Sequence, residues 1–175
     1  MATANDRLRK DHVLLGSQVS NGTAVHTTTT RTALFTAITI PANMLAIGDI
    51  IRVFCGLSFG ITGTPTILID LGVNTVAVIA TAAMTTVTAG ALLLEAVGTV
   101  RTITDQAPTT GGILWSLKIF DPGDIVEAAS IEAIQDTSVD AVATDADILL
   151  NWYVTWGTSS SSNTATGYQF FAEVN

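Results

Sequence analysis

Cysteine and histidine are scarce in this chain of 175 residues, and both shortages exclude classes of protein. The single cysteine, Cys55, cannot form a disulfide within the chain, so the fold must depend on its core or on oligomerisation. Catalysis by a serine or cysteine nucleophile usually needs a histidine base. Both histidines, His12 and His26, lie close to the N-terminus, and no G-x-S-x-G sequence occurs. We therefore expect no enzyme and no zinc site.

Phosphate-binding features are also missing. Neither G-x-x-x-x-G-K-[ST] nor G-x-G-x-x-G occurs, so no motif supports a nucleotide cofactor. The net charge is −8, and four of the seven basic residues, Arg7, Arg9, Lys10 and Arg31, precede Thr32. The remainder of the chain is strongly acidic, whereas phosphate-backbone binding needs clustered lysine and arginine. We expect no cofactor and no nucleic-acid partner.

Unbroken apolar runs are rare although the mean hydropathy is +0.49. Residues 71–94 carry no charge and are numerous enough to span a bilayer. This stretch is interrupted by Gly72, Asn74, Gly90 and several threonines. Its apolar residues therefore occur in short groups, which is atypical of a membrane helix. The polar start MATANDRLRKDH has no apolar segment of the kind found in a signal peptide. We expect no membrane partner, and attribute the hydropathy to buried strands in an oligomer.

β-branched residues dominate what is present. Threonine occurs 28 times, 48% of residues are hydrophobic and only 13% are charged. Such side chains suit a pleated sheet better than a helix. Apolar residues alternate with others in successive runs separated by turn formers, and the period of two indicates half-buried strands. Strands are expected over residues 34–40, 50–59, 66–71, 75–80, 91–104, 113–120, 148–156 and 164–174.

These runs, with no helical segments between them, predict one all-β domain over residues 31–175. We expect an antiparallel, jelly-roll-like β-sandwich of about eight strands, preceded by an extended N-terminal arm over residues 1–30. Residues 125–134 fit either a strand or an irregular excursion.

Aromatic residues near the C-terminus allow a sugar-binding interpretation, but their spacing favours the core. Trp152 and Trp156 share the apolar face of their strand, where a core or subunit interface is expected. In the last strand, Tyr168 and Phe170 are expected on one face and Phe171 on the other. Phe171 is therefore the better candidate for an exposed or interfacial ring.

Four carboxylates between residues 136 and 147 are the only candidates for a metal site. Clustered carboxylates can hold Ca²⁺, but the EF-hand spacing is absent and a solvated loop is the commoner fate. We predict no metal site; the candidates, should one exist, are Asp136, Asp140, Asp145 and Asp147.

Two interpretations of the arm stay open. It is either a disordered terminus or an anchor that becomes ordered on a partner. The partner-binding residues under the second interpretation are Arg7, Leu8, Arg9, Lys10, Val13 and Leu14.

Several sequence features together resemble a β-sandwich domain of tailed-bacteriophage virion proteins. A Thr-rich lead enters a strand that ends in Ile40-Pro41-Ala42-Asn43, followed by Leu45 and by Gly48-Asp49-Ile50-Ile51-Arg52. Further matches are the strand from Leu94 to Arg101 and a C-terminal part with W-x-x-x-W, a serine-rich tip and Q-F-x-x-E-V. The resemblance covers roughly Thr27 to Val174 and is one of pattern, without a catalytic signature.

The resemblance implies a jelly-roll-like homotrimer on the capsid surface of a virion. A free-standing domain with a short arm suits a capsid decoration (cement) protein, which would bind the major capsid protein and stabilise the phage head. The alternative is a receptor- or glycan-binding module of a tail or head fibre. Loops such as Gly157 to Asn163 would then recognise a host surface glycan.

Overall fold

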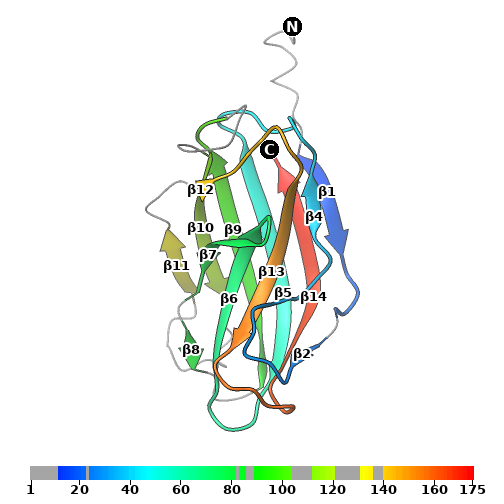
Figure 1. The fold of residues 1–175 in the computed structure, drawn as a ribbon, viewed down its shortest axis with the longest axis vertical. Helices are drawn as coiled ribbons and strands as arrows, with labels where there is room; N and C mark the ends of the chain where they lie inside the picture. Colours follow the sequence, from blue (N-terminus) through cyan, green and yellow to red (C-terminus); the bar gives the residue numbers. More distant parts are fainter. Residues whose placement is uncertain are drawn as a thin grey trace, which may run out of the picture.

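Two antiparallel sheets pack face to face in the computed structural model (Figure 1). The structure describes residues 12–22, 24–81, 83–85, 89–103, 112–120, 131–135 and 140–175. The larger sheet contains, in spatial order, β1 (Val13–Gln18), β14 (Thr164–Val174), β5 (Ile50–Gly60), β9 (Gly90–Val100), β10 (Gly112–Phe120) and β11 (Ile131–Gln135), with β2 (Val25–His26) paired to β14 and β12 (Asp140–Ala141) paired to β10. The smaller sheet contains β3 (Thr32–Ala33), β13 (Ile148–Trp156), β6 (Thr66–Val73) and β7 (Val76–Ala80), with β4 (Ile38–Ile40) paired to β13 and β8 (Met84–Thr85) paired to β6.

The prediction of an antiparallel two-sheet sandwich is confirmed. The long strands β5, β9, β10, β13 and β14 lie where the alternation of apolar residues predicts them. The chain passes from one sheet to the other between β5 and β6 and again between β13 and β14, whereas the β6–β7 and β9–β10 hairpins stay within a sheet. No helix long and apolar enough to cross a bilayer occurs in the described part of the chain.

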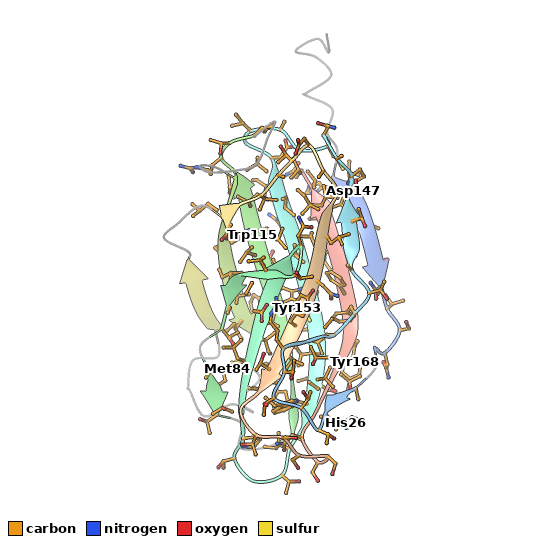
Figure 2. The ribbon with its side chains drawn as sticks, viewed as in Figure 1. His26, Met84, Trp115, Asp147, Tyr153 and Tyr168 are labelled. Atoms are coloured by element: carbon orange, nitrogen blue, oxygen red, sulfur yellow. The ribbon has the colours of Figure 1, made fainter. Side chains whose placement is uncertain are left out.

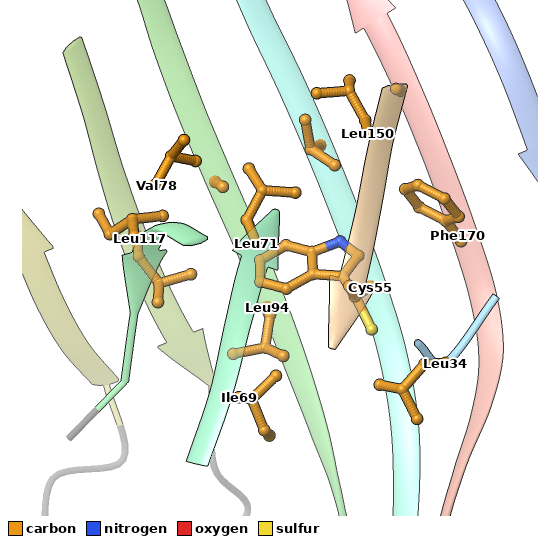
Figure 3. Packing of buried hydrophobic residues seen from close by; sticks show 14 of the residues in the cluster. Leu34, Cys55, Ile69, Leu71, Val78, Leu94, Leu117, Leu150 and Phe170 are labelled. Atoms are coloured by element: carbon orange, nitrogen blue, oxygen red, sulfur yellow. The ribbon is translucent and has the colours of Figure 1, made fainter. Parts of the chain in front are cut away.

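The core lies between the sheets and consists of the inward-facing side chains of both. On β13, Trp152 and Trp156 are at most 1% exposed, as their alternation predicts. Figure 3 shows Cys55 and Leu94 of the larger sheet and Leu150 of the smaller one among the buried side chains between the sheets. Burial of this apolar surface is the main favourable contribution to folding in a chain without a disulfide.

Cys55 is fully buried on β5, and burial raises the pKa of its thiol. Because the thiolate is the reactive form, we expect no reaction with a water-soluble disulfide reagent in the native state and one equivalent after denaturation. The absorbance of the thiol released from the reagent measures how many cysteines react in the native and in the denatured state. Rapid labelling of the native protein would contradict the packing of β5.

The structure corrects the arm expected over residues 1–30. Val13–Gln18 pairs along β14, with Ser17 opposite Phe171, and β2 pairs with the start of β14. Val25 is buried, and its carbonyl accepts a hydrogen bond from Trp156 Nε1 at 3.3 Å. Residues 12–22 and 24–30 therefore belong to the sandwich, because the edge of β14 offers backbone partners that an isolated arm lacks. Residues 1–11 lie outside the described part.

The strand expected over residues 34–40 is also shorter than predicted. Leu34 and Phe35 are both buried while Thr36 is exposed, so the alternation fails before β4 begins at Ile38. Backbone bonding explains the break, because Leu34 N donates to Trp152 O at 2.8 Å. Pro41 ends β4, as expected of a residue that cannot donate to a ladder.

A β-bulge changes the faces of β14. The register with β5 shifts between Gly167 and Gln169, so Tyr168 points outward instead of sharing the inner face of Phe170. The Tyr168 hydroxyl hydrogen-bonds to Ser58 Oγ on the outer side of β5. Bulges bend a strand and redirect its side chains, and here the bulge adds an exposed ring to the outer surface of the larger sheet.

Candidate interaction surface

The middle of the outer face of the smaller sheet, around Asp70 and Tyr153, is covered by Arg31 of the same chain. The chain between β2 and β4 crosses β13 in the view of Figure 1, and β3 pairs with the edge of β13. Arg31 lies over the Tyr153 ring, with Cζ 3.6 Å from its centroid. Arg31 Nε donates to both carboxylate oxygens of Asp70, at 3.0 and 2.9 Å, and Nη1 donates to Thr75 O at 2.6 Å. The hydrogen-bonded Asp70 carboxylate raises the pKa of Arg31 above its usual value. Figure 2 shows Tyr153 near the middle of the molecule, close to this crossing.

This ion pair has a structural role. Asp70 is only 1% exposed, although it points to the outer side of β6. A Cβ at Gly72 would lie 2.5 Å from Tyr153 Cε2 and 2.6 Å from Arg31 Nη2, so glycine leaves the room that the guanidinium needs. The sequence analysis did not identify the pair, although an isolated acid in the apolar strand TILIDLGV is a signal that could have found it.

The outer face of the larger sheet differs, because side chains of four long strands lie there without a covering segment among the described residues. We call it the aromatic face and define it by its apolar members Phe54, Leu93, Phe120, Tyr168 and Phe171 and its charged members Arg52, Glu95, Lys118 and Glu173. They come from β5, β9, β10 and β14, on the side opposite the core.

Apolar side chains occupy the middle of the aromatic face. Phe54 and Phe171 stand opposite each other in register, with ring centroids 5.1 Å apart and planes inclined by 16°. The Leu93 side chain lies over Gly56 of the neighbouring strand and is in register with Phe120. Leu93 is 46% exposed and Tyr168 is 41% exposed. The face therefore presents large apolar groups to solvent, which is typical of an interaction surface when they are contiguous.

Charges of both signs accompany these rings. Arg52 Nη1 lies 3.9 Å from Glu95 Oε1, and Lys118 is in register with Glu95 on the other side. Glu173 is in register with Arg52, and His12 Nδ1 lies 3.5 Å from Glu173 Oε1. After Thr32 the chain has only three basic residues, and two of them are on this face. The charges of the four charged members of the face sum to zero, although the domain as a whole is strongly acidic.

The partner-binding candidates of the sequence analysis are only in part described. Val13 and Leu14 lie on the edge strand β1 and are 38% and 61% exposed. Leu14 is in register with Glu173, so it borders the aromatic face. Arg7, Leu8, Arg9 and Lys10 lie outside the described residues. Phe171, expected to be exposed or interfacial, lies half-buried on the aromatic face.

The acidic candidates for a metal site serve different local structures. Asp147 Oδ1 accepts a hydrogen bond from Ala42 N at 2.9 Å, which holds the turn after β4. Asp140 belongs to β12 and pairs with Ile113, Asp145 is exposed, and Asp136 lies outside the described residues. Within the ranges that the structure describes, no three His, Cys, Asp or Glu side chains are arranged to hold a metal ion.

The serine-rich tip, residues 157–163, is held by hydrogen bonds at its C-terminal end. Asn163 is 1% exposed, its Nδ2 donates to Thr158 O at 3.3 Å, and its Oδ1 accepts from Thr62 N at 3.2 Å. Thr27 N donates to Ser160 O at 3.1 Å. The tip expected to recognise a glycan is thus bonded to both neighbouring segments of the same chain.

A hollow of about 320 Å³ lies between residues 18–22 and 33–36. The Gln18 amide spans it, since Nε2 donates to Thr36 O at 2.5 Å and Oε1 accepts from Thr36 N at 3.2 Å. None of the described residues that line it is charged, so we assign it no ligand.

Compared with known proteins, the chain matches no protein-family model and no curated protein.

Proposed function

We propose that this chain is a structural virion protein, a trimeric capsid decoration protein without catalytic activity that binds the major capsid protein and stabilises the phage head. The observation that carries the proposal is the pairing of β1 with β14, which tethers the residues before His12 to one end of a sandwich edge. Those residues carry Arg7, Arg9 and Lys10 against Asp6 and Asp11, a net charge of +1, whereas the sandwich itself is acidic. A basic segment on an acidic domain suits a contact with a separate surface at that end.

Oligomerisation would make such a short contact effective. Three modest anchors on one trimer bind jointly, because attachment of the first raises the effective concentration of the others. The sandwich supplies a rigid support for them, with a core that is continuous between the two sheets. The resemblance to phage virion domains supports the same assignment.

Truncation at the boundary that β1 defines tests the anchor. Removing residues 2–11 leaves β1 and β2 in place, so we expect wild-type thermal stability and oligomeric state. Binding to purified capsids, measured by co-sedimentation, should fall by at least about a hundredfold because multivalent attachment is lost. Undiminished capsid binding would refute the anchor.

A longer truncation serves as the contrast. Removing residues 2–26 also deletes β1 and β2, which leaves the outer edge of β14 unpaired. We expect a lower melting temperature and aggregation, since an unpaired edge strand is prone to intermolecular pairing. Equal melting temperatures of the two truncated proteins would contradict the placement of β1 in the sheet.

A glycan-binding module of a tail or head fibre is the second candidate, favoured by the exposed Tyr168 ring beside the exposed Gln169. Aromatic rings stack on sugars, and the hydrogen bond from the Tyr168 hydroxyl to Ser58 Oγ holds this ring on the surface of the sheet. Binding of the isolated protein to a glycan array, lost in Tyr168→Ala, would support this candidate. Binding to capsids, together with no binding to any glycan on the array, would favour the decoration protein.

A further inference from the structure

We infer that the aromatic face is the surface through which copies of this chain associate with one another. The inference deepens the proposed function and rests on it for the number of copies in the assembly. The face itself is argued from its exposed apolar side chains, its charge and its area.

The apolar side chains have a geometry that a second protein surface can cover. Leu93 of β9 is 46% exposed and lies opposite Gly56, two residues along the strand from the position facing the stacked Phe54 and Phe171 rings, with Phe120 in register on the other side. Aromatic residues surrounded by polar groups are the usual anchors of protein interfaces. Burying these side chains would remove a contiguous apolar surface from water, which favours association.

The charge of the face identifies a second copy as the occupant. The whole chain carries −8, so two copies repel each other through most of their surfaces. On the aromatic face Arg52 and Lys118 balance Glu95 and Glu173, and the local charge is zero. Copies that meet at this face bring no excess of like charge into direct contact, and the interleaved signs allow ion pairs across the contact. A basic or acidic partner would gain no long-range attraction from a neutral face.

The area is sufficient for a specific contact. Four strands of nine to eleven residues form the face. At ~3.3 Å per residue and ~4.8 Å between strands, it measures about 30 by 19 Å, or roughly 600 Å². Two such faces in full mutual contact bury about 1,200 Å², the lower end of the range for stable complexes. In a trimer each copy would divide the same area between its two neighbours.

The opposite outer face does not offer an equivalent surface. At its centre, Asp70 is covered by Arg31, which lies on the Tyr153 ring, and Asn151 Nδ2 donates to Phe35 O at 2.6 Å. Arg31 and the backbone of Phe35 thus occupy the middle of this face, while Leu93 and Tyr168 of the larger sheet stay exposed.

A pair of matched leucine substitutions tests the inference. Leu93 and Leu149 are 46% and 42% exposed, each lies within a long strand, and they occupy the outer faces of opposite sheets. In light scattering coupled to size exclusion we expect the wild type and Leu149→Glu to be oligomers of equal mass. Leu93→Glu should be a monomer, or should need a concentration at least about tenfold higher to assemble, because it places a charge among the apolar side chains of the contact.

Folding and charge are checked separately. Near-ultraviolet circular dichroism of the core tryptophans should be the same in Leu93→Glu as in wild type, which separates lost association from lost folding. Lys118→Glu leaves the face with an excess of negative charge, so it should weaken association at low salt and recover at high salt, where repulsion is screened. An effect of Lys118→Glu that does not depend on salt would count against the charge argument.

The outcomes separate this inference from the proposed function. A monomeric wild type at about 100 µM, or an unchanged mass for a folded Leu93→Glu, overturns the aromatic face as the contact. Loss of a dimer rather than a trimer in Leu93→Glu supports the face and contradicts the trimer. An oligomer that Leu93→Glu disrupts but that does not bind capsids supports the face and contradicts the decoration protein.

Discussion

Replacing Arg31 with alanine is expected to lower the free energy of unfolding by about 3–5 kcal/mol. The substitution leaves the Asp70 carboxylate, 1% exposed on β6, without its cation. It also removes the guanidinium from the Tyr153 ring and the hydrogen bond to Thr75 O. An uncompensated buried charge is costly because the protein interior cannot replace the solvation by water. Urea denaturation followed by tryptophan fluorescence, at one protein concentration, measures the change.

Two further variants serve as controls for Arg31→Ala. Arg101→Ala removes an exposed arginine just after β9 and should change the free energy of unfolding by no more than about 0.5 kcal/mol. Adding Asp70→Asn to Arg31→Ala should recover part of the loss, since an amide carries no charge to bury. A loss below about 1 kcal/mol in Arg31→Ala would show that the pair behaves as a surface ion pair and that residues 27–36 do not depend on it.

Trp152→Ala is expected to destabilise the sandwich by a similar amount, about 3–5 kcal/mol, because it opens a cavity between the sheets. Trp152 is fully buried on β13, among the inward-facing residues of both sheets. Calorimetry should show a lower melting temperature with the native secondary structure retained. A variant that melts like the wild type would mean that the sheets close over the cavity.

Phenylalanine substitutions divide this effect into packing and hydrogen bonding. Within the described part of the chain Trp152 Nε1 has no acceptor, whereas Trp156 Nε1 donates to Val25 O. Trp156→Phe should therefore cost about 0.5–1.5 kcal/mol more than Trp152→Phe, because only the former breaks a bond that holds β2. Equal costs would assign the role of Trp156 to packing alone.

The strands were predictable because their signal is local. On β13 every second residue from Ile148 to Trp156 is apolar, and a strand places those side chains on one face regardless of its neighbours. The same reasoning placed Cys55 in the core and Phe171 on the opposite face from Phe170. Alternation failed at Leu34 and Phe35, where the backbone bonds to β13 rather than continuing as a strand.

The candidate surface was less predictable, because its members come from distant parts of the chain. Arg52, Glu95 and Lys118 stand side by side only through the register of β5, β9 and β10. Tyr168 joins them through a bulge at Gly167, and a one-residue shift of register is not encoded in a period of two. Val13 and Leu14 were predicted as contacts of an arm, and only the pairing with β14 shows that they form a sheet edge.

The amino-acid sequence by itself thus determined the class of fold, the long strands and, apart from the bulge in β14, the side of each long strand that faces the core. These follow from the spacing of apolar residues along a few positions. Tertiary structure alone decided which strands are neighbours, which outer face the chain covers with Arg31 and which it leaves open. The physical reason is that pairing, ion pairs and surface charge depend on residues far apart in the chain, such as Arg31 with Asp70 and Phe54 with Phe171. No local pattern specifies contacts at those separations.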